Sequence, residues 1–142
     1  MDKIIVYTDG GSRGNPGASA IGVVIGDNNY SRYLGVATNN QAEYQAVIFA
    51  LKKIKQLYGK NDTKTSEVEI RMDSELAVEQ LSGRYKIKDK DLQDLFFEIW
   101  NLKPDFGRVG FIHIPREENK IADSLVNQEL DKEERLAKNR LF

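Results

Sequence analysis

The chain has no cysteine, one histidine and three prolines among its 142 residues. Without cysteine there is no disulfide scaffold, cysteine zinc site or thiol nucleophile, and we expect a reducing, cytoplasmic location. A single histidine excludes a histidine-rich metal site and argues against a serine–histidine hydrolase. No apolar run approaches the roughly 20 residues of a membrane span. The first residues also lack the pattern of a signal peptide, so we expect no membrane partner.

Charge is nearly balanced, with 21 basic and 22 acidic residues and a formal net charge of −1. This balance gives no strong overall attraction to nucleic acid. Carboxylates are the only abundant metal ligands, so a bound metal would be a hard, oxygen-bound cation. The length predicts a single domain over residues 1–142. Its charged tail, residues 131–142, is expected either to fray or to form the end of the last helix.

Hydrophobic patterning predicts the element order β-β-β-α-β-α-α-β-α. The first three strands form an antiparallel meander. The later two are separated by helices and can run parallel to the first, which is typical of an α/β sandwich with a mixed sheet. Strands are expected at 3–9, 18–25, 30–37, 67–73 and 108–114; helices are expected to end near residues 58, 81, 102 and 138.

The first strand is almost entirely apolar, which predicts burial on both faces and an end at Asp9. The glycine-rich segment 10–17 follows it. Its spacing is not that of a Walker loop, and a strand rather than a helix comes next, which excludes a dinucleotide fingerprint. Two interpretations stay open: a tight hairpin turn, or a backbone nest for phosphate.

The first helix has a countable apolar stripe, and extending this stripe one turn backward reaches Glu43. A carboxylate therefore points toward the sheet, which is costly without a partner. The helix ending near residue 102 has its own inward stripe. The stripes are Val47, Ala50, Leu51, Ile54 and Leu57 in the first helix, and Leu92, Leu95, Phe96, Ile99 and Trp100 in the other.

Four acids lie at element boundaries or on buried faces: Asp9, Glu43, Asp73 and Asp123. Asp9 and Asp73 follow strands whose carboxyl ends meet at one edge of a parallel sheet, where open α/β sheets bind ligands. Clustered carboxylates repel one another unless divalent cations neutralise them, and Mg²⁺ suits such a site. Local interpretations stay open, since Asp73-Ser74 could cap a helix and Asp123 could complement a helix dipole.

Several segments, in this order along the chain, resemble the signature segments of type 1 ribonuclease H. The resemblance covers about residues 3–130, and the four motifs in register are much more specific than any one of them. They are Tyr7-Thr8-Asp9-Gly10-Gly11-Ser12 with Gly14-Asn15-Pro16-Gly17, then Thr38-Asn39-Asn40-Gln41-Ala42-Glu43, Met72-Asp73-Ser74 and Asn119-Lys120-Ile121-Ala122-Asp123.

The resemblance implies a five-stranded mixed sheet in which strands 1–3 are antiparallel and strands 4 and 5 run parallel to strand 1. It implies cleavage of the RNA strand of RNA–DNA hybrids to 5′-phosphate and 3′-hydroxyl ends. Two Mg²⁺ or Mn²⁺ ions would be held by Asp9, Glu43, Asp73 and Asp123, and Glu43 would also meet the ribose 2′-hydroxyl. Hybrid contacts are implied for Gly10, Gly11, Asn15, Thr38, Asn39 and Asn40.

Three features depart from the family pattern. The loop before the last acid, residues 115–118, lacks the histidine that many members carry there, so Arg116 is our candidate for a phosphate-facing assistant and Glu117 a weaker one. His113 precedes this loop on a strand, and we interpret it as a packing or structural residue. The basic extension is reduced to residues 83–88, which either contact phosphates through lysines or form a solvated connector. We also expect no separate hybrid-binding module, as in the compact archaeal and bacterial branch that the chain resembles.

Two other functions compete with this hypothesis. One is a catalytically silent nucleic-acid-binding domain of the same fold, and the other is a nuclease that prefers double-stranded RNA. We expect a monomer whose binding to the hybrid is modest, salt-sensitive and dependent on metal ions.

Overall fold

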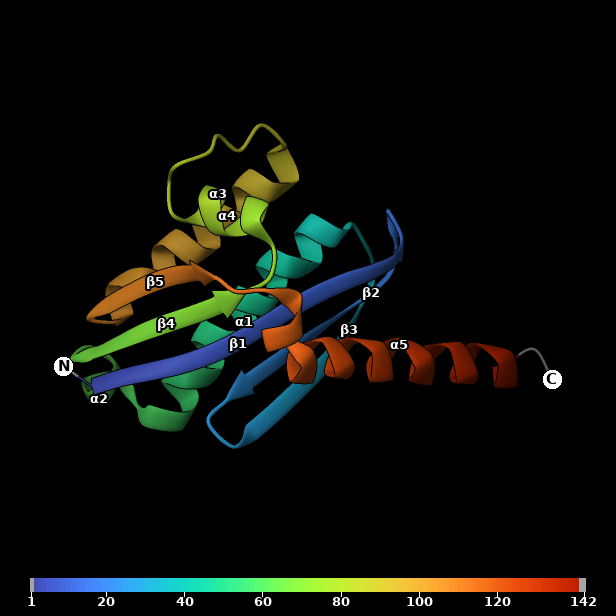
Figure 1. The fold of residues 1–142 in the computed structure, drawn as a ribbon, viewed down its shortest axis with the longest axis horizontal. Coiled ribbons are helices and arrows are strands. Elements are labelled where there is room, and N and C mark those ends of the chain that lie inside the picture. Colours follow the sequence, from blue (N-terminus) through green and yellow to red (C-terminus); the bar gives the residue numbers. More distant parts are fainter. Residues whose placement is uncertain (1, 141–142) are drawn as a thin grey trace.

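The computed structural model describes residues 2–140 as a five-stranded sheet in the order β3-β2-β1-β4-β5, with helices on both faces (Figure 1). Strands β1, β2 and β3 are antiparallel neighbours, and β4 and β5 run parallel to β1, as predicted. The elements are β1 (Asp2–Gly14), β2 (Gly17–Ile25), β3 (Asn28–Ala37), α1 (Asn39–Tyr58), α2 (Lys60–Thr63), β4 (Ser66–Met72), α3 (Glu75–Leu81), α4 (Lys90–Leu102), the 3-10 turn η1 (Lys103–Asp105), β5 (Arg108–His113), the 3-10 turn η2 (Arg116–Glu118) and α5 (Lys120–Arg140).

Strand β1 is longer than predicted, and Asp9 does not end it. Antiparallel pairing with β2 continues to the pair Gly14–Gly17, so most of the glycine-rich segment is strand and the turn is only two residues long. Parallel pairing with β4 stops earlier, at the pair Tyr7–Arg71. Asp9 therefore lies within β1, just past the point where β4 leaves it. Glycine is compatible with this longer strand, because a strand residue without a side chain lets the backbone of a neighbouring helix approach closely.

Two glycines set the distance between the sheet and its helices. A Cβ atom built on Gly10 would lie 2.2 Å from the carbonyl carbon of Ala42 in α1. A Cβ atom on Gly22 of β2 would lie 2.2 Å from the carbonyl oxygen of Ala122 in α5. Both helices thus rest directly on strand backbone, and the N-terminal turns that carry Glu43 and Asp123 are held close to β1 and β2.

Helix α1 begins as its sequence predicts. Thr38 is the N-cap, its hydroxyl accepts the Gln41 N–H, and the Gln41 side chain accepts the Thr38 N–H, which completes a capping box. Glu43 lies on the buried face, as the extended stripe predicts. Leu57, in the last turn, is 45% exposed, so its place in the stripe was predicted wrongly.

Other sequence predictions need correction. The first strand is not buried on both faces, because Lys3 and Ile5 are exposed on the sheet face that no helix covers at this end. Trp100 points away from the core and is 56% exposed, with its ring stacked on Phe96. Segment 59–66, whose polar sequence predicts a loop, contains the short helix α2. The interpretation of Asp73-Ser74 as a helix cap, by contrast, is confirmed for Ser74, whose hydroxyl accepts the Ala77 N–H at the start of α3.

The charged C-terminal segment is helical through Arg140, so α5 forms most of the predicted tail; residues 141–142 lie outside the described part. Arg13, beside the β1–β2 turn, forms ion pairs with Asp131 at 2.8 Å and Glu134 at 2.7 Å. This guanidinium connects the hairpin to the second half of α5. No helix within residues 2–140 is long and apolar enough to cross a membrane.

Replacing Arg13 with Ala is expected to loosen the end of α5 with little loss of global stability. Both ion pairs are largely exposed, and exposed pairs contribute only about 0–1 kcal/mol. Amide exchange should accelerate at residues 131–140 and stay slow at residues 120–127. Lys52→Ala, which breaks the exposed pair with Glu98 elsewhere, serves as the control. Unchanged exchange in Arg13→Ala would show that the guanidinium does not hold the helix end.

Candidate metal centre

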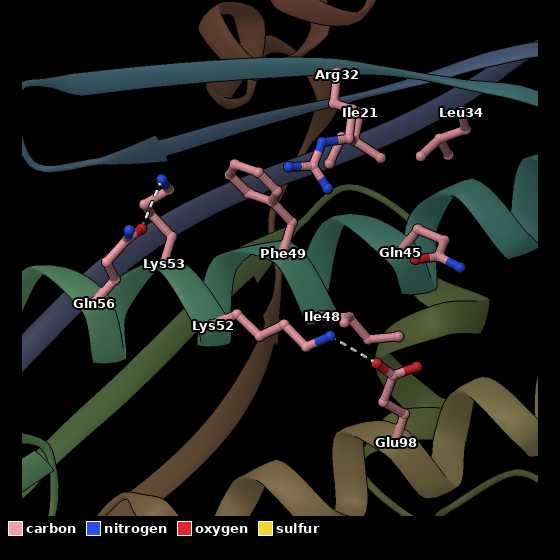
Figure 2. Close-up of a pocket in the computed structure, with 10 residues that line it drawn as sticks. All are labelled: Ile21, Arg32, Leu34, Gln45, Ile48, Phe49, Lys52, Lys53, Gln56 and Glu98. Atoms are coloured by element: carbon pink, nitrogen blue, oxygen red, sulfur yellow. Dashed lines mark hydrogen bonds and ion pairs between the residues drawn. The ribbon is translucent and has the colours of Figure 1, made fainter.

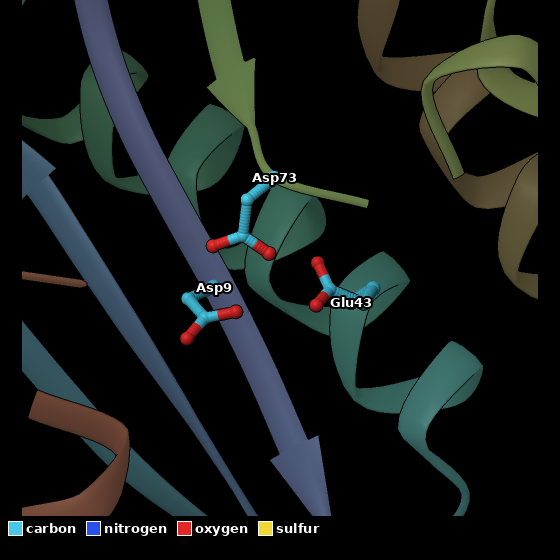
Figure 3. A group of neighbouring side chains, drawn as sticks. All are labelled: Asp9, Glu43 and Asp73. Carbon is cyan, nitrogen blue, oxygen red and sulfur yellow. The ribbon is translucent and has the colours of Figure 1, made fainter. Parts of the chain in front are cut away.

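Three carboxylates from separate elements meet at the point where β1 and β4 diverge (Figure 3). Asp9 comes from β1, Glu43 from the second turn of α1, and Asp73 from the residue that follows β4. Each offers one carboxylate oxygen, and these three oxygens lie within 4.8 Å of one another. The sequence predicted these residues as metal ligands because Asp9 and Asp73 lie at strand ends and Glu43 lies on the buried stripe of its helix. The tertiary structure brings all three together.

Burial makes this cluster electrostatically costly. Asp9 and Glu43 are each 7% exposed, and Asp73 is half-buried. Burial, followed by the charge of Asp73, raises the pKa of Asp9 from 3.8 to about 7. Burial, followed by the charges of Asp9 and Asp73, raises the pKa of Glu43 well above its usual value. Around neutral pH the cluster therefore favours either a bound proton or a bound cation.

The chemistry of the donor set fits a hard divalent cation. The cluster contains only carboxylate oxygens, which Mg²⁺ and Mn²⁺ accept as ligands. The Glu43 Oε2 atom is buried and has no hydrogen-bond partner in the protein. A buried carboxylate oxygen without a donor loses its hydration and gains nothing in return, so a cation at this point would satisfy it.

Asp123 lies near the cluster but does not complete it. It is half-buried in the first turn of α5, and its negative charge contributes to raising the pKa of Asp9. Its carboxylate is not among the oxygens that gather within 4.8 Å. The structure thus brings three of the four predicted acids together and leaves the fourth beside them.

Asn119 is a site residue whose position the sequence interpretation described incompletely. The sequence predicts that Asn119, or an acid just before it, caps α5, but the Asn119 Oδ1 atom has no hydrogen-bond partner, so it does not accept a helix N–H. Its Nδ2 atom instead donates to the Thr8 carbonyl at 2.9 Å and to Asp73 Oδ2 at 3.0 Å. The signal available in the sequence was only its spacing, four residues before Asp123.

The polar residues predicted to contact a substrate bind one another in the free protein. Asn15 Oδ1 accepts the Asn39 N–H at 3.0 Å, and Asn39 Oδ1 accepts the Ser12 N–H at 2.9 Å. These bonds fix the β1–β2 turn against the start of α1. Thr38 caps that helix, and Asn40 is half-buried in its first turn.

Gly10 and Gly11 lie within β1, and a packing requirement explains the first of them. Gly10 is buried against the backbone of α1. A Cβ atom on Gly11 would lie 3.3 Å from a methyl group of Val126 in α5, a tight but adjustable contact. The absence of a side chain at Gly10 therefore serves helix packing, whatever role its backbone has toward a substrate.

His113 and Arg116 flank the segment between β5 and α5, and both are exposed. Of the two roles expected for His113, packing or structural, the packing role is therefore wrong. Arg116 begins η2, the short turn that leads into α5.

Arg116→Ala is expected to slow turnover far less than Asp73→Asn, because an exposed guanidinium can assist at a phosphate but does not belong to the acid cluster. His113→Gln should keep most of the activity, because the imidazole is exposed and does not belong to the acid cluster. Steady-state rates of the three variants check this order. Equal losses for Arg116→Ala and Asp73→Asn, or near-complete loss for folded His113→Gln, would contradict it.

A separate groove lies between the β2–β3 hairpin and α1 (Figure 2). It has a volume of about 270 Å³, and none of the four acids lines it. The Arg32 guanidinium lies 4.9 Å from the centre of the Phe49 ring, and Lys52 pairs with Glu98 of α4. Its lining combines three basic side chains with apolar residues, two glutamines and one glutamate, so its chemistry differs from that of the acid cluster.

Comparison with known proteins gives consistent results. A family profile described as "Reverse transcriptase-like" matches residues 7–129. Ribonuclease HI of Halobacterium salinarum is 38% identical over 135 residues, which cover 91% of this chain and 65% of that protein. Ribonuclease H of Polynucleobacter asymbioticus is 34% identical over 143 residues and 88% of both chains. A bifunctional protein of Mycobacterium tuberculosis is 38% identical, and this chain spans only 36% of its length.

Solved structures extend the match to three dimensions. The crystal structure of LC11-RNase H1 in complex with an RNA/DNA hybrid has a TM-score of 0.86 and 47% identity, covering 91% of this chain and 97% of that one. RNase H1 from Halobacterium salinarum has a TM-score of 0.83 at 37% identity, covering 92% and 98%. Sequence and fold agree with these relatives over nearly the whole chain, which therefore belongs to the type 1 ribonuclease H family.

Proposed function

We propose that this protein is a metal-dependent endoribonuclease that hydrolyses the RNA strand of RNA–DNA hybrids. The observation that carries the proposal is the meeting of Asp9, Glu43 and Asp73 within 4.8 Å, with a buried Glu43 oxygen that has no partner in the protein. A site of this kind is stable near neutral pH only with protons or cations, and cations are the species useful for phosphoryl chemistry.

Mg²⁺ or Mn²⁺ would be held by Asp9, Glu43 and Asp73, with Asp123 as the ligand on the α5 side. Two such ions, when bound, supply positive charge that stabilises the attacking and departing oxygens of a phosphodiester. The protein's own part is to hold these carboxylates in place: the Gly10 contact keeps α1, with Glu43, close to β1, and the Gly22 contact keeps α5, with Asp123, close to β2. Preformed placement of charge lowers the reorganisation needed during reaction.

Hydrolysis at this site would join a water oxygen to phosphorus and break the bond between phosphorus and the 3′-oxygen. The products then carry 5′-phosphate and 3′-hydroxyl ends. Glu43 lies on the first helix next to the proposed path of the RNA strand, where it can accept a hydrogen bond from a ribose 2′-hydroxyl. That group distinguishes RNA from DNA, so the contact would give selectivity for the RNA strand.

The path for the hybrid would run along the β1–β2 turn and the start of α1. There Asn15 Oδ1 accepts the Asn39 N–H, and Asn39 Oδ1 accepts the Ser12 N–H. These bonds hold both side chains in place, so their amide NH₂ groups would lie on a fixed surface. Thr38, Asn40, the backbone of Gly10 and Gly11, and Arg116 from η2 would supply the other contacts with the hybrid. The hybrid bound to LC11-RNase H1, at 47% identity, supports this choice of substrate.

A cleavage assay with labelled hybrid, duplex RNA and duplex DNA in Mg²⁺ or Mn²⁺ tests the proposal, with Asp9→Asn as the control. The RNA strand of the hybrid should be cut fastest. Its products should be substrates for a ligase, which requires 5′-phosphate and 3′-hydroxyl ends. Faster cutting of duplex RNA would replace the proposed substrate. Binding of the hybrid without cleavage in either metal would identify a silent binding domain instead.

A further inference from the structure

Asn119 connects three of the elements that carry the acids. It follows η2 and directly precedes α5, and its backbone carbonyl accepts the Asp123 N–H at 3.1 Å in the first turn of that helix. Its side chain reaches the Thr8 carbonyl, one residue before Asp9, and the carboxylate of Asp73. It is 1% exposed, so these bonds are shielded from water.

The orientation of the Asn119 amide is determined by its neighbours. Both partners, the Thr8 carbonyl oxygen and Asp73 Oδ2, are acceptors when Asp73 is ionised. The opposite orientation would place the amide oxygen against two other oxygens, so only the NH₂ group satisfies this position. Aspartate at position 119 would have the same shape and would lack both donor hydrogens.

The location of the bonds explains why a side chain is needed there. Parallel pairing between β1 and β4 ends at Tyr7–Arg71, and the two strands diverge beyond it. The Asn119 amide bridges this gap from the Thr8 backbone to the Asp73 side chain. A hydrogen bond to Oδ2 restrains rotation of the Asp73 carboxylate and leaves its other oxygen available to a cation.

We infer that Asn119 is a positioning residue: through Asp73 it sets the geometry, and hence the cation affinity, of the acid cluster. This inference rests on the proposed function, because it assumes that the cluster binds a divalent ion. Groups that orient metal-binding carboxylates typically change metal affinity or activity by about 10–100-fold when removed. A cap or packing residue would change the stability of α5 without changing the affinity for the ion.

Calorimetric titration of the metal-free, full-length chain with MnCl₂ tests the inference without relying on catalysis. Asn119→Ala should raise the Mn²⁺ dissociation constant by about 10-fold or more. In cleavage assays its kcat should fall while its KM for the hybrid stays within about twofold. Leu130→Ala is the matched control, because it weakens packing of the same helix far from the acids, where Leu130 is 3% exposed. It should lower the melting temperature and leave Mn²⁺ affinity unchanged.

A second variant keeps the test decisive if Asn119→Ala does not fold. Asn119→Ser keeps a small polar side chain that cannot reach both Thr8 and Asp73, so it should also weaken Mn²⁺ binding. Wild-type Mn²⁺ affinity in whichever of the two variants folds would overturn the inference, while wild-type protein that binds no Mn²⁺ would instead overturn the proposed function. Weakened binding in Leu130→Ala to the same degree would show that helix stability, rather than the amide, controls the site.

Discussion

Asp9→Asn is expected to abolish hybrid cleavage and, in the same protein, to stabilise the metal-free fold above neutral pH. Cleavage should fall by on the order of 10³-fold, because the loss of a carboxylate ligand removes several kcal/mol of charge stabilisation by the ions. Asparagine keeps the shape of the side chain, which is 7% exposed, so the packing around it should persist. The effects on activity and stability are opposite because the clustered carboxylates bind the ions but destabilise the fold when no ion is bound.

The sign of the stability change follows from the pKa of Asp9, which burial and the charge of Asp73 raise from 3.8 to about 7. Between these two values the folded protein keeps a proton that the unfolded chain releases. The free energy of unfolding of the metal-free wild type should therefore decrease as the pH rises from about 4 to about 7. Asp9→Asn carries no charge there and should be more stable by on the order of 1–3 kcal/mol at about pH 8.

Urea unfolding in the presence of a chelator, measured across this pH range, checks the prediction. Added Mg²⁺ should stabilise the wild type increasingly as the pH rises through 7 and should stabilise Asp9→Asn much less. Asp27→Asn, an exposed aspartate in the β2–β3 turn, is the matched control for the loss of one negative charge. A metal-free Asp9→Asn that is less stable than wild type at high pH would contradict this account of the cluster.

Gly10→Ala should destroy both the fold around the site and its activity. The new methyl group would lie 2.2 Å from the Ala42 carbonyl carbon and 2.5 Å from the Glu43 backbone nitrogen. These are backbone atoms of a packed helix, so they cannot rotate away as a side chain would. We expect a loss of about 3 kcal/mol or more in the free energy of unfolding. Any molecules that fold would have the start of α1, and therefore Glu43, displaced from Asp9.

Gly110→Ala is the matched control for this prediction. Gly110 is also a strand glycine, in β5, but a Cβ atom there would meet nothing within 4 Å. Alanine should leave stability unchanged or slightly improved, since glycine is unfavourable in strands. Urea unfolding and hybrid cleavage measure both variants. A folded, active Gly10→Ala would mean that α1 can move away from the sheet at little cost.

Local sequence pattern was sufficient to predict most of the architecture. Periodicity identified each of the strands and main helices. The helices between the later strands allowed a parallel arrangement, because a parallel pair needs a crossover, and the family resemblance implied that β4 and β5 run parallel to β1. Glu43 was found by extending the apolar stripe of its helix, since a helix places residues four positions apart on the same face. The same rule wrongly predicted that Leu57 and Trp100 are buried, because an apolar stripe predicts only the side of the helix on which a residue lies. Whether another element covers that side depends on tertiary packing.

The four acids were thus identified from the sequence as residue types in unusual positions, together with a family resemblance that grouped them. Their distances were decided only by the fold. The sequence predicted that β1 ends at Asp9, but its pairing with β2 continues to Gly14. Asp9 lies close to Asp73 because the pairing of β1 with β4 ends just before these two residues. The sequence indicated that Gly10 belongs to a turn, whereas in the structure it contacts the backbone of α1. The sequence favoured Asn119 as a helix cap, whereas its side chain donates to Asp73. Contacts between residues this far apart in sequence depend on how whole elements pack, and no local period records that packing.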